Sequence, residues 1–79
     1  MTKLNEILRR TGSVTTYKVY EFTKEYITEK GFSPTFRDIG VSCNIAPSTA
    51  SQHIDKLVAL GYLMRDGKIA RSIRIIKEV

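Results

Sequence analysis

The chain has 79 residues, of which 42% are hydrophobic and 27% are charged. This length allows one small domain with a modest core, and it excludes doubly wound sheets and barrel enzymes. The hydrophobic share is too high for an intrinsically disordered chain. Most enzymes need more chain to shield a reaction from water, so these values favour a binding module over a catalyst.

The charge balance indicates a polyanionic partner. The 13 Lys and Arg residues outnumber the 8 Asp and Glu residues and leave a net charge of +5. The isoelectric point of about 9.6 lies above the value of about 9 that indicates nucleic-acid binding. Five basic residues and one acid fall between positions 65 and 77, so most of the excess charge lies in one short segment. A basic surface that serves only solubility is the alternative.

The chain has one cysteine, Cys43, and one histidine, His53. This set is too small for an internal disulfide or a metal site. The first ten residues are polar and no long apolar run follows, so we expect neither a signal peptide nor a membrane segment. We therefore expect a cytoplasmic protein, nucleoid-associated in a bacterium or phage, with no cofactor, no membrane partner and no small-molecule ligand.

A short helix is predicted over residues 4–10, with Leu4, Ile7 and Leu8 on one face. The glycine of Thr11-Gly12-Ser13 then breaks it. We treat residues 1–12 as an N-terminal extension that is helical in part, and residues 13–79 as the domain itself.

A longer helix is predicted over residues 14–30, where apolar side chains such as Val19 and Phe22 recur at helical spacing. Ser13 or Thr15 can cap its start. Gly31 suits the left-handed residue that ends a helix.

The next predicted helix is short and spans about residues 36–42. Pro34 disfavours helix at the residue before it. Thr35 and Asp38 have the spacing of a capping box. Asn44 tolerates positive φ and can make the tight turn that follows.

Another helix is predicted from Pro47, which suits the first helical position, to the glycine at position 61. Its apolar stripe consists of Ala50, Ile54, Leu57 and Val58. The remainder of the chain predicts a β-hairpin: residues 62–65 form one strand, Asp66-Gly67 is a tight-turn signal, and Ile73 and Ile75 alternate with polar residues in a second strand.

This order predicts an α+β fold, a winged helix-turn-helix with three main helices followed by a two-stranded β-hairpin wing. The helix at about residues 47–60 would enter the major groove of double-stranded DNA, and the basic wing at residues 65–74 would contact the backbone.

The residues also resemble a known family. The run from Tyr26 to Ile39, with its KGFSPTFRDI segment, and the run from Ser48 to Leu63 are similar to the DNA-binding domain of the LexA repressor. The resemblance covers about residues 13–76. It implies a sequence-specific transcriptional repressor with a winged-helix domain. The family's repressors carry a second domain with a self-cleaving Ser/Lys dyad, and we expect this domain to stand alone without it.

The predicted recognition helix departs from the family's pattern. The family has Ser before the helix proline and Asn after it, where this chain has Ala46 and Ser48. An acidic pair precedes the family's His, where this chain has Ser51 and Gln52. The resemblance therefore implies the family's fold with a different operator.

The candidate site residues follow from these positions. We expect base reading by Ser48, Thr49, Ser51 and Gln52, because their polar tips can pair with base edges. Local capping is the alternative for the hydroxyls. His53 is expected to be a framework residue. We expect backbone contacts from Thr35, Arg37, Lys56, Arg65, Lys68 and Arg71. No residue set suits catalysis or metal binding.

The leading hypothesis is a homodimeric repressor, because one winged helix reads few base pairs and two-fold operators double the contacts. The predicted apolar face of residues 4–10 is the most plausible extra contact surface. The alternative function is a winged-helix module for protein–protein contact, such as an antirepressor or assembly adaptor. A small hydrolytic enzyme is the least favoured class.

Overall fold

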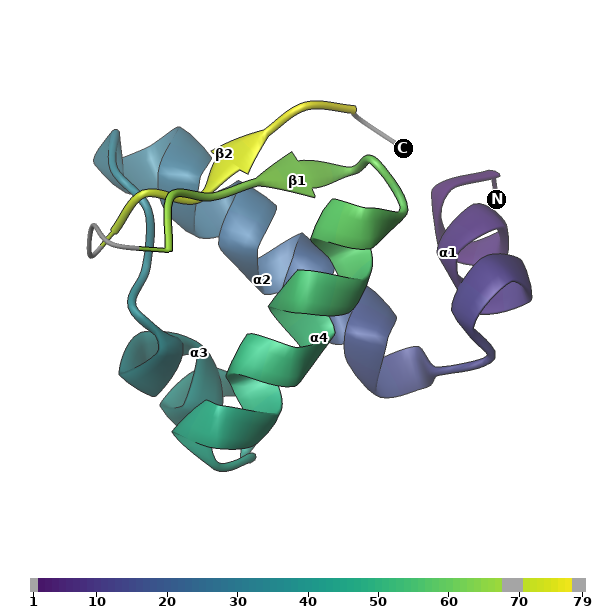
Figure 1. The fold of residues 1–79 in the computed structure, drawn as a ribbon, viewed down its shortest axis with the longest axis horizontal. Coiled ribbons are helices and arrows are strands. Elements are labelled where there is room, and N and C mark those ends of the chain that lie inside the picture. The colour runs from purple at the N-terminus through teal and green to yellow at the C-terminus, as the bar shows by residue number, and fades with distance from the viewer. Residues whose placement is uncertain (1, 68–70, 78–79) are drawn as a thin grey trace.

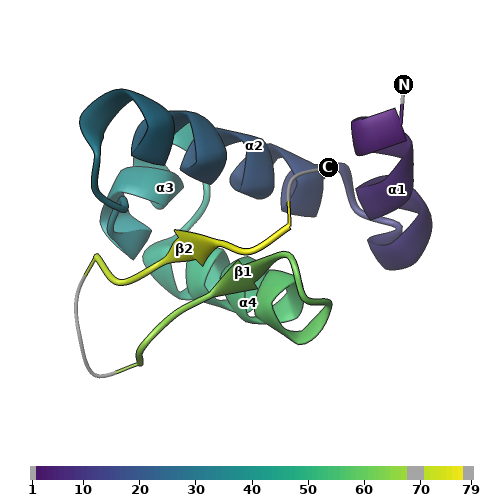
Figure 2. The same ribbon diagram turned by 90° about the horizontal axis from the view of Figure 1, so that it is seen from above.

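The computed structural model describes residues 2–67 and 71–77, with side chains from residue 6 onward. The elements in chain order are α1 (Thr2–Thr11), α2 (Val14–Lys30), α3 (Phe36–Cys43), α4 (Pro47–Ala59), β1 (Leu63–Met64) and β2 (Arg74–Ile75). Helices α2, α3 and α4 pack on one another, and the strands lie beside them (Figure 1). This confirms the predicted winged-helix fold. In both views α1 lies at the end of the molecule opposite the hairpin loop (Figure 2).

The ends of α2 follow from local sequence. The Ser13 hydroxyl accepts a hydrogen bond from the backbone amide of Thr16 at 3.1 Å, which satisfies one unpaired donor of the first turn. Gly31 ends the helix at φ 81° and donates its amide to the Ile27 carbonyl. The predicted range of residues 14–30 is therefore confirmed. No helix in the described part of the chain is long and apolar enough to cross a membrane.

The core draws on α1, the other three helices and the wing. Its buried hydrophobic side chains are Ile7, Val19, Tyr20, Ile39, Ala50, Ile54, Leu57, Tyr62, Leu63 and Ile73. Because Ile7 is 0% exposed inside its own protomer, the expectation that it forms part of a dimer surface is wrong. A helix of ten residues is marginal alone, so α1 buries this face against α2. Leu8 is half-buried, and the side chain of Leu4 lies outside the described residues.

Polar contacts also join α1 to the two ends of the wing, through Tyr62 before β1 and Lys77 after β2. The buried Tyr62 donates its hydroxyl proton to the Glu6 carboxylate and accepts a hydrogen bond from Arg10 at 3.2 Å. Lys77 donates to the same carboxylate at 3.1 Å. The hydrogen bonds from Tyr62 and then Lys77 lower the pKa of Glu6. The N-terminal helix therefore fixes the chain where it leaves β2.

The wing differs from the tight hairpin that we predicted. Leu63 pairs with Ile75 and Met64 with Arg74, so residues 65–73 connect the strands and Asp66-Gly67 is not a two-residue turn. The Ser72 hydroxyl accepts the Asp66 amide at 2.9 Å and donates to the Asp66 carbonyl at 2.8 Å. These side-chain bonds replace the strand pairing that a tight turn would have produced. The predicted alternation holds, since Ile73 is buried and Arg74 is exposed.

Candidate nucleic-acid interface

A close backbone approach forms the turn between α3 and α4. Asn44 ends α3 in the left-handed region at φ 60°, as its sequence predicts. The Ile45 amide donates to the Gly40 carbonyl at 2.9 Å. A Cβ at Gly40 would lie 2.5 Å from the Ile45 carbonyl oxygen. Only glycine fits here without a backbone shift, so Gly40 sets the separation of the two helices.

The predicted capping box opens α3. The Thr35 hydroxyl accepts the Asp38 amide at 3.1 Å, and the Asp38 carboxylate accepts the Thr35 amide at 3.0 Å. The Thr35 backbone bond is the main cause of the lowered pKa of Asp38. Thr35 is half-buried, and Arg37 is exposed in the first turn. Both predicted backbone-contact residues therefore lie at the start of α3, although the Thr35 hydroxyl is already used in the cap.

Helix α4 presents a polar outer face. It begins at Pro47, although Ala46 makes no side-chain cap hydrogen bond. Ser48 and Gln52 are exposed, while Thr49 and Ser51 are half-buried beside them. Residues four apart share one face of a helix, so Ser48 and Gln52 form the outermost stripe of the predicted base readers.

A side-chain hydrogen bond joins α4 to α2. The buried Thr16 hydroxyl and the His53 Nδ1 atom are hydrogen-bonded at 2.8 Å. Burial, and to a smaller extent the charge of Lys56, lowers the pKa of His53. This contact gives His53 a positioning role between two helices, in line with the framework role that we expected.

Arg65, the residue after β1, contacts helices α3 and α4. Its guanidinium lies 3.1 Å from the Asp55 carboxylate of α4 and 5.0 Å from the ring centroid of Phe36 in α3. Lys56, beside Asp55, is exposed. The Arg65–Asp55 pair could not be predicted, because no periodicity relates the residue after a strand to a preceding helix.

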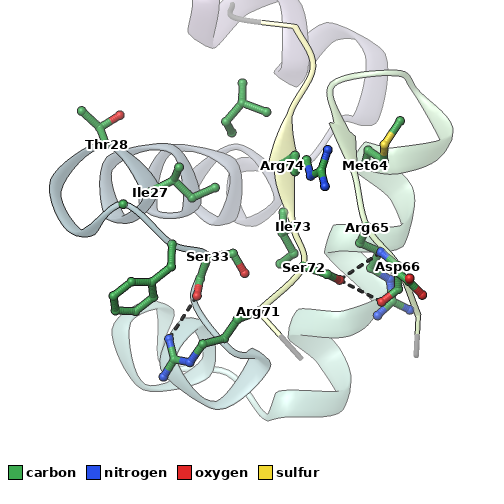
Figure 3. A pocket seen from close by; sticks show the side chains of 13 residues that line it. Ile27, Thr28, Ser33, Met64, Arg65, Asp66, Arg71, Ser72, Ile73 and Arg74 are labelled. Carbon is green, nitrogen blue, oxygen red and sulfur yellow. Dashed lines mark hydrogen bonds between the residues drawn. The ribbon is translucent and has the colours of Figure 1, made fainter. Parts of the chain in front are cut away.

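Arg71 returns from the wing to the junction of α2 and α3. Its guanidinium donates to the Ser33 carbonyl at 3.0 Å (Figure 3). A second hydrogen bond from the guanidinium reaches the Tyr26 hydroxyl at 3.2 Å. It also lies 3.5 Å from the Asp38 carboxylate and 5.0 Å from the Phe32 ring centroid. Arg71, which we predicted to contact the DNA backbone, is therefore already bound by groups of the protein itself in the absence of DNA.

Arg74 and Lys68 are the other cations of the wing. Arg74 is exposed on β2 and was not among the predicted site residues, although its alternation with Ile73 and Ile75 already indicated an outward position. Lys68, a predicted backbone contact, lies outside the described residues. A groove of about 750 Å³ separates the wing from the C-terminal end of α2 (Figure 3), and Arg71 and Arg74 are among its lining residues.

Comparison with known proteins decides the family. The family model described as the LexA DNA binding domain matches residues 13–72. The chain belongs to the LexA DNA-binding domain family. The LexA-type chain is 40% identical to the LexA repressor of Thermosipho melanesiensis over 60 residues, which cover 76% of this chain and 30% of the relative. It is 41% identical to the LexA repressor of Clostridium novyi over 63 residues, or 77% and 30% of the two chains.

A third relative has a similar identity and a similar coverage. The LexA repressor of Finegoldia magna is 43% identical over 63 residues, which cover 78% of the LexA-type chain and 30% of the relative. The chain thus spans about a third of the length of these relatives. No group of three or more His, Cys, Asp or Glu side chains within the described ranges is placed to hold a metal ion.

Proposed function

We propose that the chain binds double-stranded DNA sequence-specifically and represses transcription, with α4 in the major groove and the wing on the backbone. The observation that carries this proposal is the polar outer stripe of α4, Ser48 and Gln52. The opposite face of the same helix packs into the core through the buried Ala50, Ile54 and Leu57. A helix fixed in this way presents its side chains to base edges at a constant angle. Membership of the LexA DNA-binding domain family supports the same function.

We assign base reading to Gln52 first, since its amide can pair bidentately with adenine. Ser48 contributes from the same stripe, and Thr49 and Ser51 from the flanks. Because these residues replace the family's pattern, we expect an operator different from that of LexA repressors.

Backbone binding is assigned to two groups of residues. The start of α3 brings Arg37 and backbone amides toward phosphate, and Thr35 orders that turn through its cap. Cationic side chains supply the remaining contacts: Lys56 from α4, and Arg65, Lys68 and Arg71 from the wing. Arg65 and Arg71 keep 25% and 41% of their side-chain surface exposed beside their carboxylate partners.

The biological setting is part of the proposal. We propose residues 13–79 as the DNA-binding domain and residues 1–12 as an N-terminal extension that stabilises the fold of this domain. We propose a homodimer on a two-fold operator in the cytoplasm, associated with the nucleoid in a bacterium or phage, with no catalytic activity and no cofactor. Because Ile7 is buried within the protomer, we do not assign it to the dimer contact.

A salt titration tests the proposal. Binding to a random duplex would be followed by fluorescence anisotropy at increasing salt. Neutralisation of about five phosphates gives a slope of log K against log[salt] of roughly −4 to −5. Selection from a random DNA pool then tests specificity and reveals the symmetry of the site. Absence of binding at low salt would exclude the DNA function and favour a protein–protein module.

A further inference from the structure

The backbone pairing of the wing is too short to fix its position. Each strand has two residues, and residues 65–73 connect them. A two-stranded hairpin is marginal in water without packing on other elements. Side chains must therefore determine where the wing lies relative to α3 and α4.

The backbone at Arg71 is held in an unfavourable conformation. Its φ is 56°, in the left-handed region that few residues with a Cβ adopt. Such a conformation persists where the surrounding contacts over-determine it. At Arg71 these contacts are made by its side chain.

Those contacts reach three separate places. The Tyr26 hydroxyl belongs to α2, the Ser33 carbonyl belongs to the loop after α2, and the Asp38 carboxylate belongs to the first turn of α3. Ser33 is 3% exposed, so its carbonyl belongs to the interior rather than to the surface. The planar guanidinium suits this arrangement because its five donors point in fixed directions.

Asp38 has two roles in this arrangement. Its carboxylate completes the capping box with Thr35, and it also accepts the Tyr26 hydroxyl at 3.4 Å and faces Arg71 at 3.5 Å. An acid on the helix that crosses the DNA backbone would repel phosphate. Its pairing with Arg71 offsets that repulsion and links the start of α3 to the wing.

We propose that Arg71 is a positioning residue of the DNA-binding surface, whose contacts with Tyr26, Ser33 and Asp38 form a latch that sets where the wing meets the duplex. This inference rests on the proposed function. The geometry of the Arg71 guanidinium and its positive charge can be tested separately. A lysine at this position keeps the charge but cannot reproduce the planar set of donors.

Two substitutions separate the latch from a simple phosphate contact. Arg71→Lys keeps the charge and loses the planar fork. Asp38→Asn keeps an acceptor for the Thr35 amide and removes a negative charge near DNA. If only charge mattered, the first change would be neutral and the second would tighten binding. The latch predicts that both weaken DNA binding, by about 3- to 10-fold for the loss of one or two polar contacts.

The matched control is Arg74→Lys, the same change at an exposed residue of β2. We expect it to alter affinity less than twofold. The double variant of Arg71 and Asp38 should bind about as well as the weaker single variant, because both changes open one latch. Wild-type affinity in Arg71→Lys, or tighter binding in Asp38→Asn, would overturn the latch.

A measurement without DNA keeps the two proposals apart. Backbone ¹⁵N relaxation of the free protein would report the order of residues 71–75, with urea unfolding to confirm that each variant is folded. The latch predicts increased motion there in Arg71→Lys and Asp38→Asn, and unchanged motion in Arg74→Lys. Unchanged motion in all three rejects the latch even if DNA binds. Increased motion in the first two, with no DNA binding by the wild type, would show that these contacts order the wing and would reject the proposed function on which the inference rests.

Discussion

Replacing Gly40 with alanine tests the geometry of the helix–turn–helix directly. The added Cβ would lie 2.5 Å from the Ile45 carbonyl oxygen, and the next closest atom is the Pro47 nitrogen at 3.5 Å. The close neighbour is backbone, so no rotamer change can relieve the contact. The Gly40 carbonyl also accepts the Ile45 amide, and any shift that relieves the clash strains this hydrogen bond.

The expected magnitude follows from two opposing effects. Alanine favours a helix interior over glycine by about 0.8–1 kcal/mol. Overpacking costs roughly 1–3 kcal/mol, and a rigid backbone contact belongs at the upper end of that range. We therefore expect Gly40→Ala to lower the free energy of unfolding by about 2 kcal/mol. For a domain of this size the midpoint of thermal unfolding would fall by roughly 8–16 °C.

The measurement is urea and thermal unfolding followed by circular dichroism. Gly67→Ala is the matched control, because nothing lies within 4 Å of a Cβ at that position and its stability should stay close to wild type. DNA affinity should fall in the Gly40 variant as α4 moves relative to α3. A Gly40→Ala protein as stable as wild type, or more stable, would refute the close-approach argument.

Four further outcomes are expected. Gln52→Ala should relax the preference at one base pair by about 1–3 kcal/mol, measured by competition with single-base operator variants. Thr35→Ala should lower the free energy of unfolding by about 1 kcal/mol, whereas Thr28→Ala on the exposed end of α2 should not. Burial lowers the pKa of His53 from 6.5, so the unfolded state binds a proton more readily than the folded state. The free energy of unfolding should therefore decrease as the pH falls below about 6.5. Urea unfolding should detect this decrease in the wild type and not in His53→Gln. Tyr62→Phe should speed amide exchange in α1 and leave α3 and α4 unchanged, since it removes the hydroxyl that α1 contacts.

Helix boundaries could be predicted because their causes are local. Ser13 and Thr35 cap the amides three residues ahead, and Gly31 and Asn44 take the left-handed conformation that ends each helix. Each signal lies within a few residues of the feature it determines. The exposed face of α4 could be predicted equally well, because helical spacing separates the outer Gln52 from the apolar stripe.

The wing and its contacts could not be predicted in the same way. Asp66-Gly67 is a local turn signal, but the Ser72 hydroxyl forms hydrogen bonds with the backbone amide and carbonyl of Asp66. The strands pair only before and after this segment, at Leu63–Ile75 and Met64–Arg74. The partners of Arg65 and Arg71 lie on other elements, so only the folded chain brings them together. The same holds for Ile7, whose burial depends on the docking of α1 against α2.

The position of Cys43 provides a reporter of local opening. It is the last residue of α3, half-buried against the core beside the turn to α4. Burial raises the pKa of its thiol, so little reactive thiolate exists at neutral pH while the turn is closed. As the chain has one cysteine, a thiol-specific reagent can label one position only. A change in the rate of labelling of Cys43 should therefore report a change in the opening of the turn between α3 and α4 in native buffer, with or without DNA.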